Sequence, residues 1–256
     1  MERDSYTNQS ISRAIKVLEA LCQGKGEAGI SELSRKVGLH KSVVHRILVT
    51  LEENEWVEKD GNSGKYRLGL GILSIRSSLM RHPLIAVSRP IMMKLLELTD
   101  ETIVLAVENK IGAICIEKLE TPRSVKLTSE VGRYFPLHAG ATGIAILIGM
   151  PESRIRSHLF SKPLERYTER TWTDPHKVLE RVLKLKELGY ATITGEVDEG
   201  ATAIAVPLVI RHGEIYGSLT IGMPEYRFSE KKEREFVPLL FEAAEEITKA
   251  LDASGI

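Results

Sequence analysis

The stretch LHKSVVHRIL, residues 39–48, mixes five aliphatic residues with a lysine, a serine, two histidines and an arginine, and it has no acidic residue. Through residues 41–53 the apolar residues recur at spacings of three and four, which defines one face of an amphipathic helix. That face consists of Val44, Ile47, Leu48 and Leu51. The opposite face consists of Ser42, His45, Arg46 and Val49. The stretch therefore predicts a helix with one face for a core and a basic face for a partner.

The segments on either side of this helix give the order of secondary-structure elements of a known motif. Apolar spacing predicts a first helix over residues 11–22, with Ser10 or Ser12 as its cap. A short second helix follows an N-cap at Ser31 and ends at Gly38, where a left-handed backbone costs little. After the third helix, β-prone residues flank the turn sequence DGNSG and predict a hairpin. Helix, helix, turn, helix and hairpin is the order of a winged helix-turn-helix.

The basic face predicts a complex with double-stranded DNA. No Asp or Glu occurs between Ser34 and Leu51, and such a surface suits DNA because basic side chains displace the counterions of its phosphates. The side chains expected to read base edges are Ser42, His45 and Arg46. Those expected to contact phosphates or the minor groove are Arg35, Lys41, Lys59, Lys65 and Arg67. A solvated helix face is the alternative, but the helix order, the missing acids and the hairpin favour DNA.

Composition limits the class of protein. The 256 residues are 43% hydrophobic and 27% charged, which is typical of a globular chain with room for two domains. The formal net charge is zero, so any role of charge is local. Cys22 and Cys115 are too few for a disulfide framework and lack a CxxC spacing. The polar N-terminus and the longest apolar run, GIAILIGM, predict no signal peptide and no membrane span, so we expect a cytoplasmic protein.

The remainder of the chain predicts a connecting helix and an α+β domain. The segment GILSIRSSLM, residues 71–80, is helical in pattern, and Pro83 marks a break before a helix over 84–99. The predicted strands are TIVLAVE, GAICIEKLE, SVKLT, YATIT, TAIAVPLVI and IYGSLTIGM. Further helices are predicted from about His138, over 175–188 and over 230–251. Helices around an antiparallel sheet make this domain α+β.

Motifs along nearly the whole chain carry a family resemblance. ISRAIKVLEAL, ISELSRKVGLHKSVVHRILVTLEENEWVEKD and KYRLGLGILSI resemble the DNA-binding half of the IclR-type transcriptional regulators. GRYFPLHAGATGIAIL, GYATITGEVDEGATAIAVPL and GSLTIGMPEYRFSE resemble its effector-binding half. The resemblance implies a winged helix-turn-helix domain over 1–68, a linker helix over 69–81 and a GAF-like effector-binding domain over 82–256. It also implies a homodimer or homotetramer on a palindromic operator, more often as a repressor, and no cofactor.

The resemblance also implies an effector pocket between the start of the HAGATG helix and the last strands. Carried over by motif, its lining is Ala141, Thr142, Ile193, Ala203, Thr220 and Gly222. Family members that bind small oxo-acids have an acid, a thiol and two hydroxyls where this chain has Ile193, Ala203, Thr220 and Gly222, so one hydroxyl remains. An apolar wall leaves the oxygens of a small acid without donors. We therefore expect a larger organic acid, aromatic or medium-chain, whose carboxylate binds the free amides at the helix start.

His138 and Glu196 are two further candidates for contact with the effector. His138 precedes the HAGATG helix and Glu196 lies in the GEVDEG segment. A lone histidine is more often a hydrogen-bonded structural residue, and no second ligand lies at a metal-binding spacing, so we predict no metal site. Cys115 lies in an apolar strand and is expected to be buried and inert.

Two other functions remain open at the level of sequence. An enzyme tethered to DNA would use His138, Glu130 and Glu196 as acid or base. The chain has no nucleophile elbow, metal-ligand cluster or paired carboxylates at a motif spacing, so we predict that it is not an enzyme. A scaffold protein with a vestigial DNA-binding head is harder to separate from a regulator by sequence alone.

Overall fold

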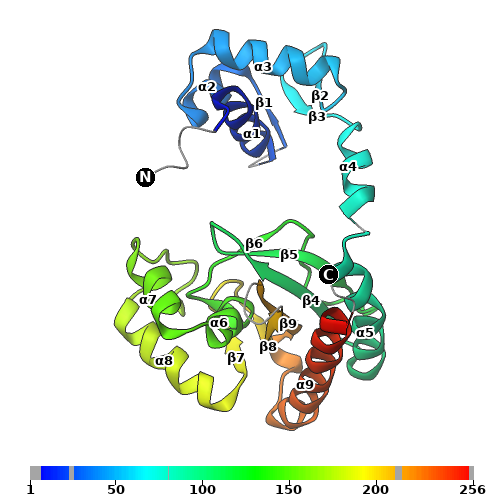
Figure 1. The fold of residues 1–256 in the computed structure, drawn as a ribbon, viewed down its shortest axis with the longest axis vertical. Helices are drawn as coiled ribbons and strands as arrows, with labels where there is room; N and C mark the ends of the chain where they lie inside the picture. Colours follow the sequence, from blue (N-terminus) through cyan, green and yellow to red (C-terminus); the bar gives the residue numbers. More distant parts are fainter. Residues whose placement is uncertain (1–6, 23–25, 80, 211–214, 254–256) are drawn as a thin grey trace. The chain divides into compact units, whose positions relative to one another are not determined.

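The structure is a computed structural model that describes residues 7–22, 26–79, 81–210 and 215–253. The chain divides into two units, residues 1–81 and 82–256, and each has its own core (Figure 1). Among the helices of the described ranges, none combines the length and the apolar character needed to cross a bilayer.

Three helices and a small sheet form the core of the N-terminal unit. The helices are α1 (Gln9–Cys22), α2 (Ile30–Val37) and α3 (Lys41–Glu53). The strands are β1 (Glu27–Ala28), β2 (Val57–Lys59) and β3 (Tyr66–Leu68), paired antiparallel in the order β1-β3-β2. The predicted helix-turn-helix and hairpin are therefore confirmed. Strand β1 is an addition that the sequence pattern did not predict.

The amphipathic pattern of α3 determines how it packs. Val44 and Leu48 are completely buried, while Ile47 and Leu51 are half-buried. They pack against buried residues of α1 and α2, among them Val17, Leu21 and Leu33. The predicted core face of α3 is therefore the observed one, which leaves its opposite face to solvent.

The helix ends show where local signals hold and where they fail. Gly38 ends α2 in the left-handed region, with φ 68°, as predicted. The predicted caps are wrong: Asn8 Oδ1 accepts from the amides of Ser10 and Ile11, and α2 follows Gly29. Ser10, Ser12 and Ser31 lie inside the helices, because α1 begins after Asn8 and α2 begins after Gly29, which has no side chain to accept.

Helix α4 (Ile72–Leu79) lies at the end of the N-terminal unit and is shorter than the predicted linker helix over 69–81. It has no buried side chain among its described residues, and Leu73 and Leu79 are more than half exposed. Gly69 precedes it, and a Cβ there would lie 2.2 Å from the Glu55 carbonyl oxygen. Only glycine permits this close approach of the chain leaving β3.

A six-stranded antiparallel sheet forms the centre of the C-terminal unit (Figure 1). The strand order is β6-β5-β4-β9-β8-β7. The strands are β4 (Thr102–Glu108), β5 (Ala113–Leu119), β6 (Tyr134–Phe135), β7 (Ala191–Thr194), β8 (Ala201–Ile210) and β9 (Ile215–Pro224). Helices α5 (Pro83–Thr99) and α9 (Glu230–Ala253) pack on one face, and α9 follows the short 3-10 helix η3 (Glu225–Arg227). The other face carries α6 (Gly140–Gly149), α7 (Glu152–Phe160) and α8 (Pro175–Leu188).

Alternation along the strands gives the two faces different side chains. On β8, Ile204 and Val206 face the α5 and α9 side, whereas Ala203 and Ala205 face the α6 side. Large aliphatic side chains therefore fill one side of the sheet, because successive strand residues point to opposite faces. Small side chains on the other side leave space beneath the start of α6.

Two local predictions for this unit need correction, and one helix was missed. Residues 124–128 form no strand, because β6 pairs with β5 and the Thr102 hydroxyl donates to the Leu127 carbonyl oxygen at 2.8 Å. Helix α6 begins at Gly140 rather than His138. The backbone before it is not helical, since Ala139 is extended and Gly140 has a positive φ of 72°. Helix α7 was not predicted. Other predicted strands and helices are present, with Met80 and residues 211–214 outside the described residues.

Candidate functional site

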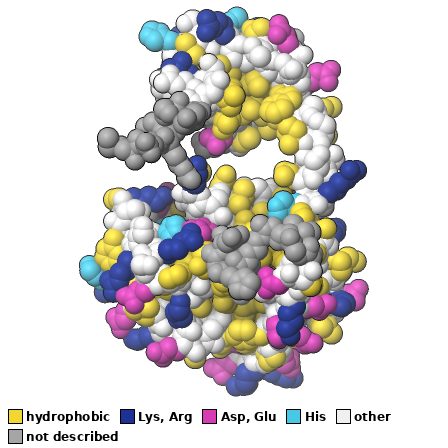
Figure 2. All heavy atoms as spheres, in the orientation of Figure 1, with side chains coloured by type: hydrophobic (Ala, Val, Ile, Leu, Met, Phe, Trp, Pro, Cys, Tyr) yellow, Lys and Arg dark blue, Asp and Glu magenta, His cyan; other side chains and the backbone are white. Residues whose placement is uncertain are grey.

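The outward face of α3 carries the polar side chains that the sequence singled out. Lys41, Ser42, His45 and Arg46 are all exposed, and Arg35 is exposed on the neighbouring α2. In Figure 2, basic side chains and histidines gather over the α2 and α3 end of this unit. The structure therefore leaves all five side chains open to solvent, four on α3 and one on α2.

The cations of this face differ from those of the hairpin in their partners. Within the described residues, Lys41 and Arg46 form no ion pair. On the hairpin, Lys65 Nζ lies 2.6 Å from Glu27 Oε1, and that hydrogen bond and charge raise the pKa of Lys65. Charge on α3 is therefore open to an external anion, while part of the hairpin charge is already balanced.

The other two predicted hairpin contacts also have neighbours. Arg67 is paired with Glu58 across the two strands. Lys59 lies over the ring of Tyr66, with its Nζ 5.7 Å from the ring centroid. Lys59, Lys65 and Arg67 all lie on the hairpin. To bind a phosphate, each would have to leave its present carboxylate or ring, or contact both at once.

A cavity lies between the start of α6 and the sheet. Its floor follows the strand register: Ile193 pairs with Ala203, and Ala203 pairs with Gly222, across β7, β8 and β9. Thr220 lies two residues along β9, opposite Val104 of β4. The small side chains in this row create the space, and Leu127 fills the position beside Gly222, 2.6 Å from where a Cβ would stand.

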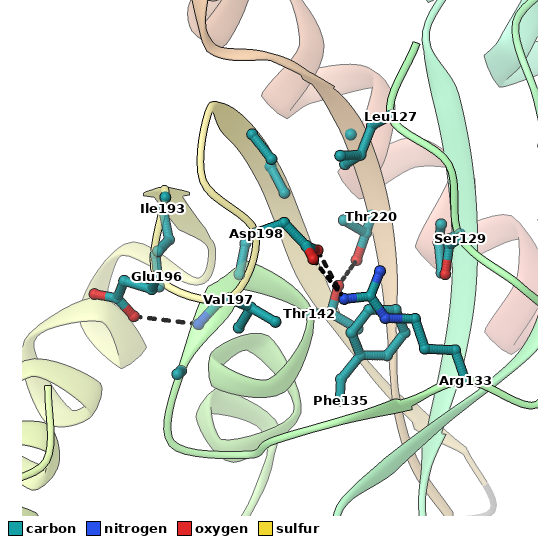
Figure 3. A pocket seen from close by; sticks show the side chains of 18 of the residues that line it. Leu127, Ser129, Arg133, Phe135, Thr142, Ile193, Glu196, Val197, Asp198 and Thr220 are labelled. Atoms are coloured by element: carbon teal, nitrogen blue, oxygen red, sulfur yellow. Dashed lines mark hydrogen bonds and ion pairs between the residues drawn. The ribbon is translucent and has the colours of Figure 1, made fainter. Parts of the chain in front are cut away.

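Seven of the eight predicted effector residues line this cavity (Figure 3). They are Ala141, Thr142, Ile193, Glu196, Ala203, Thr220 and Gly222. The eighth, His138, does not. Its Nε2 lies 2.8 Å from the Glu165 carbonyl oxygen, and it borders a separate hollow beside Leu159 and Tyr167. Burial lowers the pKa of His138, so the ring is a neutral structural residue at physiological pH.

Glu196 lines the cavity, but its carboxylate is committed to the protein. It is buried and forms an ion pair with Arg181, and its Oε2 accepts from the Gly140 amide at 3.2 Å. Arg181 in turn lies 4.5 Å from the Trp172 ring centroid. The expectation of free amides at the start of α6 is therefore wrong for Gly140, whose N–H already has an acceptor.

Sequence reasoning missed the polar residues on the other side of the cavity. Arg133, Asp198 and Ser129 line it together with the apolar side chains of Phe135 and Leu127. Arg133 and Asp198 lie inside the segments GRYFP and GEVDEG, which carry the family resemblance. Nothing in the spacing indicated that these two segments, far apart in sequence, meet across one cavity.

The cavity therefore combines apolar walls, hydroxyls and one cation. Thr142 Oγ1 and Thr220 Oγ1 lie 3.1 Å apart at its floor. Cys115 is buried nearby in β5, where burial raises its pKa to about 11 and keeps the thiol protonated. No group of three His, Cys, Asp or Glu side chains that could hold a metal occurs in the described part of the chain. Such a cavity can bind an apolar molecule with an acidic group.

Comparisons with known proteins agree with this architecture. The model of the IclR helix-turn-helix domain matches residues 10–61, and that of the IclR C-terminal domain of bacterial transcriptional regulators matches residues 76–249. The HTH-type transcriptional regulator KdgR of Escherichia coli is 32% identical over 249 residues, which cover 97% of this chain and 94% of KdgR. The transcriptional repressor IclR of Escherichia coli is 28% identical over 245 residues, covering 94% and 89% of the two chains.

A solved structure is also similar. It is an IclR homologue from Microbacterium hydrocarbonoxydans complexed with 4-hydroxybenzoate, with a TM-score of 0.77 and 27% identity. The match covers 95% of this chain and 99% of that one. The relatives are transcriptional regulators and not enzymes. The chain belongs to the IclR family of transcriptional regulators.

Proposed function

We propose that this regulator is a repressor that binds a palindromic operator through α3 and responds to an organic acid held in the cavity of its C-terminal unit. The single observation that supports DNA binding best is the outward face of α3, where Lys41 and Arg46 are exposed and form no ion pair among the described residues. The family relationship supports repression, since relatives include the transcriptional repressor IclR.

Two kinds of contact follow from the arrangement on α3. Lys41 lies in the first turn, and Arg46 lies one turn further along the exposed face. In a helix inserted into the major groove, a cation at the rim contacts phosphate and a side chain at the centre contacts base edges. We assign the phosphate role to Lys41 and Arg35, and the reading role to Ser42, His45 and Arg46.

We also propose that the protein binds its operator as a homodimer or homotetramer. A single helix-turn-helix makes few phosphate contacts, and a two-fold assembly reads two half-sites about 34 Å apart or a multiple of this. The N-terminal unit exposes apolar side chains that a second copy would cover. They are Ile11 and Ile15 on α1, Leu70 before α4, and Leu73, Ile75 and Leu79 on α4.

The cavity supports an aromatic or medium-chain acid as the effector. Its walls include Phe135, Leu127, Val104 and Ile193, which favour an apolar body, and its cation is Arg133. The similar structure from Microbacterium hydrocarbonoxydans is complexed with 4-hydroxybenzoate, a molecule of this class. For this chain, binding of an acid would change the preference between two arrangements of the DNA-binding units.

Footprinting of the purified full-length protein on DNA upstream of its own gene tests the proposal. We expect two protected half-sites with two-fold symmetry at low ionic strength, and weaker protection when a suitable aromatic or medium-chain acid is added. A protein that leaves this DNA and random duplex DNA equally unprotected would contradict operator binding. Protection that no acid changes would contradict the proposed response.

A further inference from the structure

An ion pair connects two loops that line the cavity of the C-terminal unit. Arg133 Nη2 donates to both carboxylate oxygens of Asp198, each at 2.8 Å. Arg133 lies just before β6, and Asp198 lies on the connection between β7 and β8 (Figure 3). The Arg133 guanidinium therefore already binds a carboxylate of the protein itself, that of Asp198.

The guanidinium has donors to spare. An arginine side chain carries five N–H donors, and this pair uses only those on Nη2. Among the described residues, Arg133 Nε and Nη1 have no hydrogen-bond partner. The guanidinium carbon lies 5.2 Å from the ring centroid of Phe135, which orients the group within the cavity wall. Both two-donor edges of a guanidinium include Nη2, so an external carboxylate can bind in a bidentate manner only where Asp198 leaves that nitrogen.

A second, independent feature points to a polar group of a ligand at the same place. Ser129 lines the cavity four residues before Arg133 and is only 6% exposed. Its Oγ is buried, and the contact it makes is with the thiol of Cys115, which is a weak hydrogen-bond partner. Buried hydroxyls are normally satisfied, so this one fits a ligand oxygen.

The charges around the cavity do not suit two carboxylates at once. Arg133 is the single basic residue among the described side chains that line it, and Glu196 is already paired with Arg181. A ligand carboxylate on Arg133 would therefore stand beside Asp198 with one positive charge for two negative ones. Like charges at such short range repel, so one of the carboxylates must leave.

The structure indicates which partner moves. Arg133 is fixed through its backbone, since its carbonyl oxygen accepts from the Cys115 amide of β5 at 2.9 Å. The Asp198 side chain is 42% exposed, so its carboxylate can turn to water at small cost. Binding of an acid would thus turn the Asp198 side chain away from the guanidinium and leave Arg133 in place.

We infer that Arg133 binds the acid group of the effector, with Ser129 as a second donor, and that Asp198 is a built-in competitor displaced by it. This inference rests on the proposed response to an organic acid and adds the residues that recognise it. It makes a prediction of opposite signs: removal of the Arg133 charge weakens binding, whereas removal of the Asp198 charge strengthens it. An ion pair with a purely structural role would give losses for both.

Calorimetry on the full-length protein tests the inference, with benzoate, 4-hydroxybenzoate and octanoate as probes and neutral benzamide as a reference. The variants are Arg133→Gln, Arg133→Lys and Asp198→Asn. Arg123→Gln is the matched control, because it removes an arginine–aspartate pair, to Asp100 at 2.7 Å, that does not line the cavity. Thermal melting without ligand shows whether each variant is folded.

We expect Arg133→Gln to weaken acid binding about tenfold or more, and Arg133→Lys to weaken it less. Asp198→Asn should strengthen acid binding about threefold, and Arg123→Gln should leave it unchanged. Acid binding that survives Arg133→Gln within twofold, or that falls equally in the Arg133 and Asp198 variants, overturns the inference and leaves the proposed function standing. A wild-type protein that binds none of the acids overturns both the inference and the proposed acid response.

Discussion

The hydroxyls of Thr142 and Thr220 lie 3.1 Å apart and join the first turn of α6 to β9 at the floor of the cavity. Both side chains are buried, at 7% and 2% exposure. A hydrogen bond in this position stabilises the contact between the helix and the sheet, and it also sets the polarity of the cavity floor. The same pair of hydroxyls thus affects both the stability of this contact and the polarity of the cavity floor.

The Thr142→Val variant should be less stable than the parent by about 1 to 3 kcal/mol, because it leaves the buried Thr220 hydroxyl without its partner. Thr142→Ser keeps a hydroxyl and serves as the control. Urea unfolding of the purified variants measures the difference. Equal stability of the Val variant and the parent would show that the hydroxyl pair is unimportant.

Arg46→Ala tests the assignment of a base-reading residue. If Arg46 contacts a guanine, its loss should reduce discrimination at one operator position by about 1 to 3 kcal/mol. Competition with a set of single-base operator variants measures this directly. An unchanged preference at every position would remove Arg46 from the reading face.

Gly69→Ala tests the close approach at the end of the hairpin. The added Cβ would lie 2.2 Å from the Glu55 carbonyl oxygen, so the backbone must shift, at a cost of about 1 to 3 kcal/mol. Gly61→Ala at the hairpin tip meets nothing within 4 Å and is the matched control. Thermal melting and DNA affinity should both fall for Gly69→Ala alone, and equal behaviour of the two variants would contradict this.

The neutral ring of His138 predicts a pH dependence. Burial lowers the pKa of His138 below its usual value of 6.5, so unfolding takes up a proton in mildly acidic solution. The buried neutral ring therefore does not lower the free energy of unfolding above about pH 6.5. That free energy falls as the pH drops below this value, because the unfolded chain binds the proton more readily. Between pH 7.5 and 5.5, His138→Gln should lose less stability than the parent in urea unfolding. Identical losses would mean that His138 does not contribute to the pH dependence.

Much of the fold was predictable because strong local signals agree with tertiary packing. The helix over residues 41–53 has the same bounds in the structure, since its apolar face coincides with the core of the N-terminal unit. The β-prone runs of the C-terminal unit also became strands. The segment SVKLT did not, because the edge beside β5 is taken by Tyr134 and Phe135.

Part of the cavity lining was predictable because the family motif identifies positions that the sheet brings together. The family motif predicts that Thr142, Ile193 and Ala203 lie together, and all three line the cavity, where strand register pairs Ile193 with Ala203. Arg133 and Asp198 escaped notice because their meeting depends on two loops whose paths no local pattern encodes. His138 was misplaced for the opposite reason: it is next to the cavity in sequence, but its ring turns to the Glu165 carbonyl oxygen.

The central claim is that the acid-free face of α3 lies against DNA, and the salt dependence of duplex binding tests it most directly. Affinity should be measured from low to moderate salt for the parent and for Lys41→Ala, with Lys16→Ala on α1 as a control. Loss of one phosphate contact lowers the slope of log affinity against log salt by about one. We predict this decrease for Lys41→Ala and an unchanged slope for Lys16→Ala. Identical slopes for the parent and Lys41→Ala, or no binding of duplex DNA by the parent at low salt, would contradict the claim.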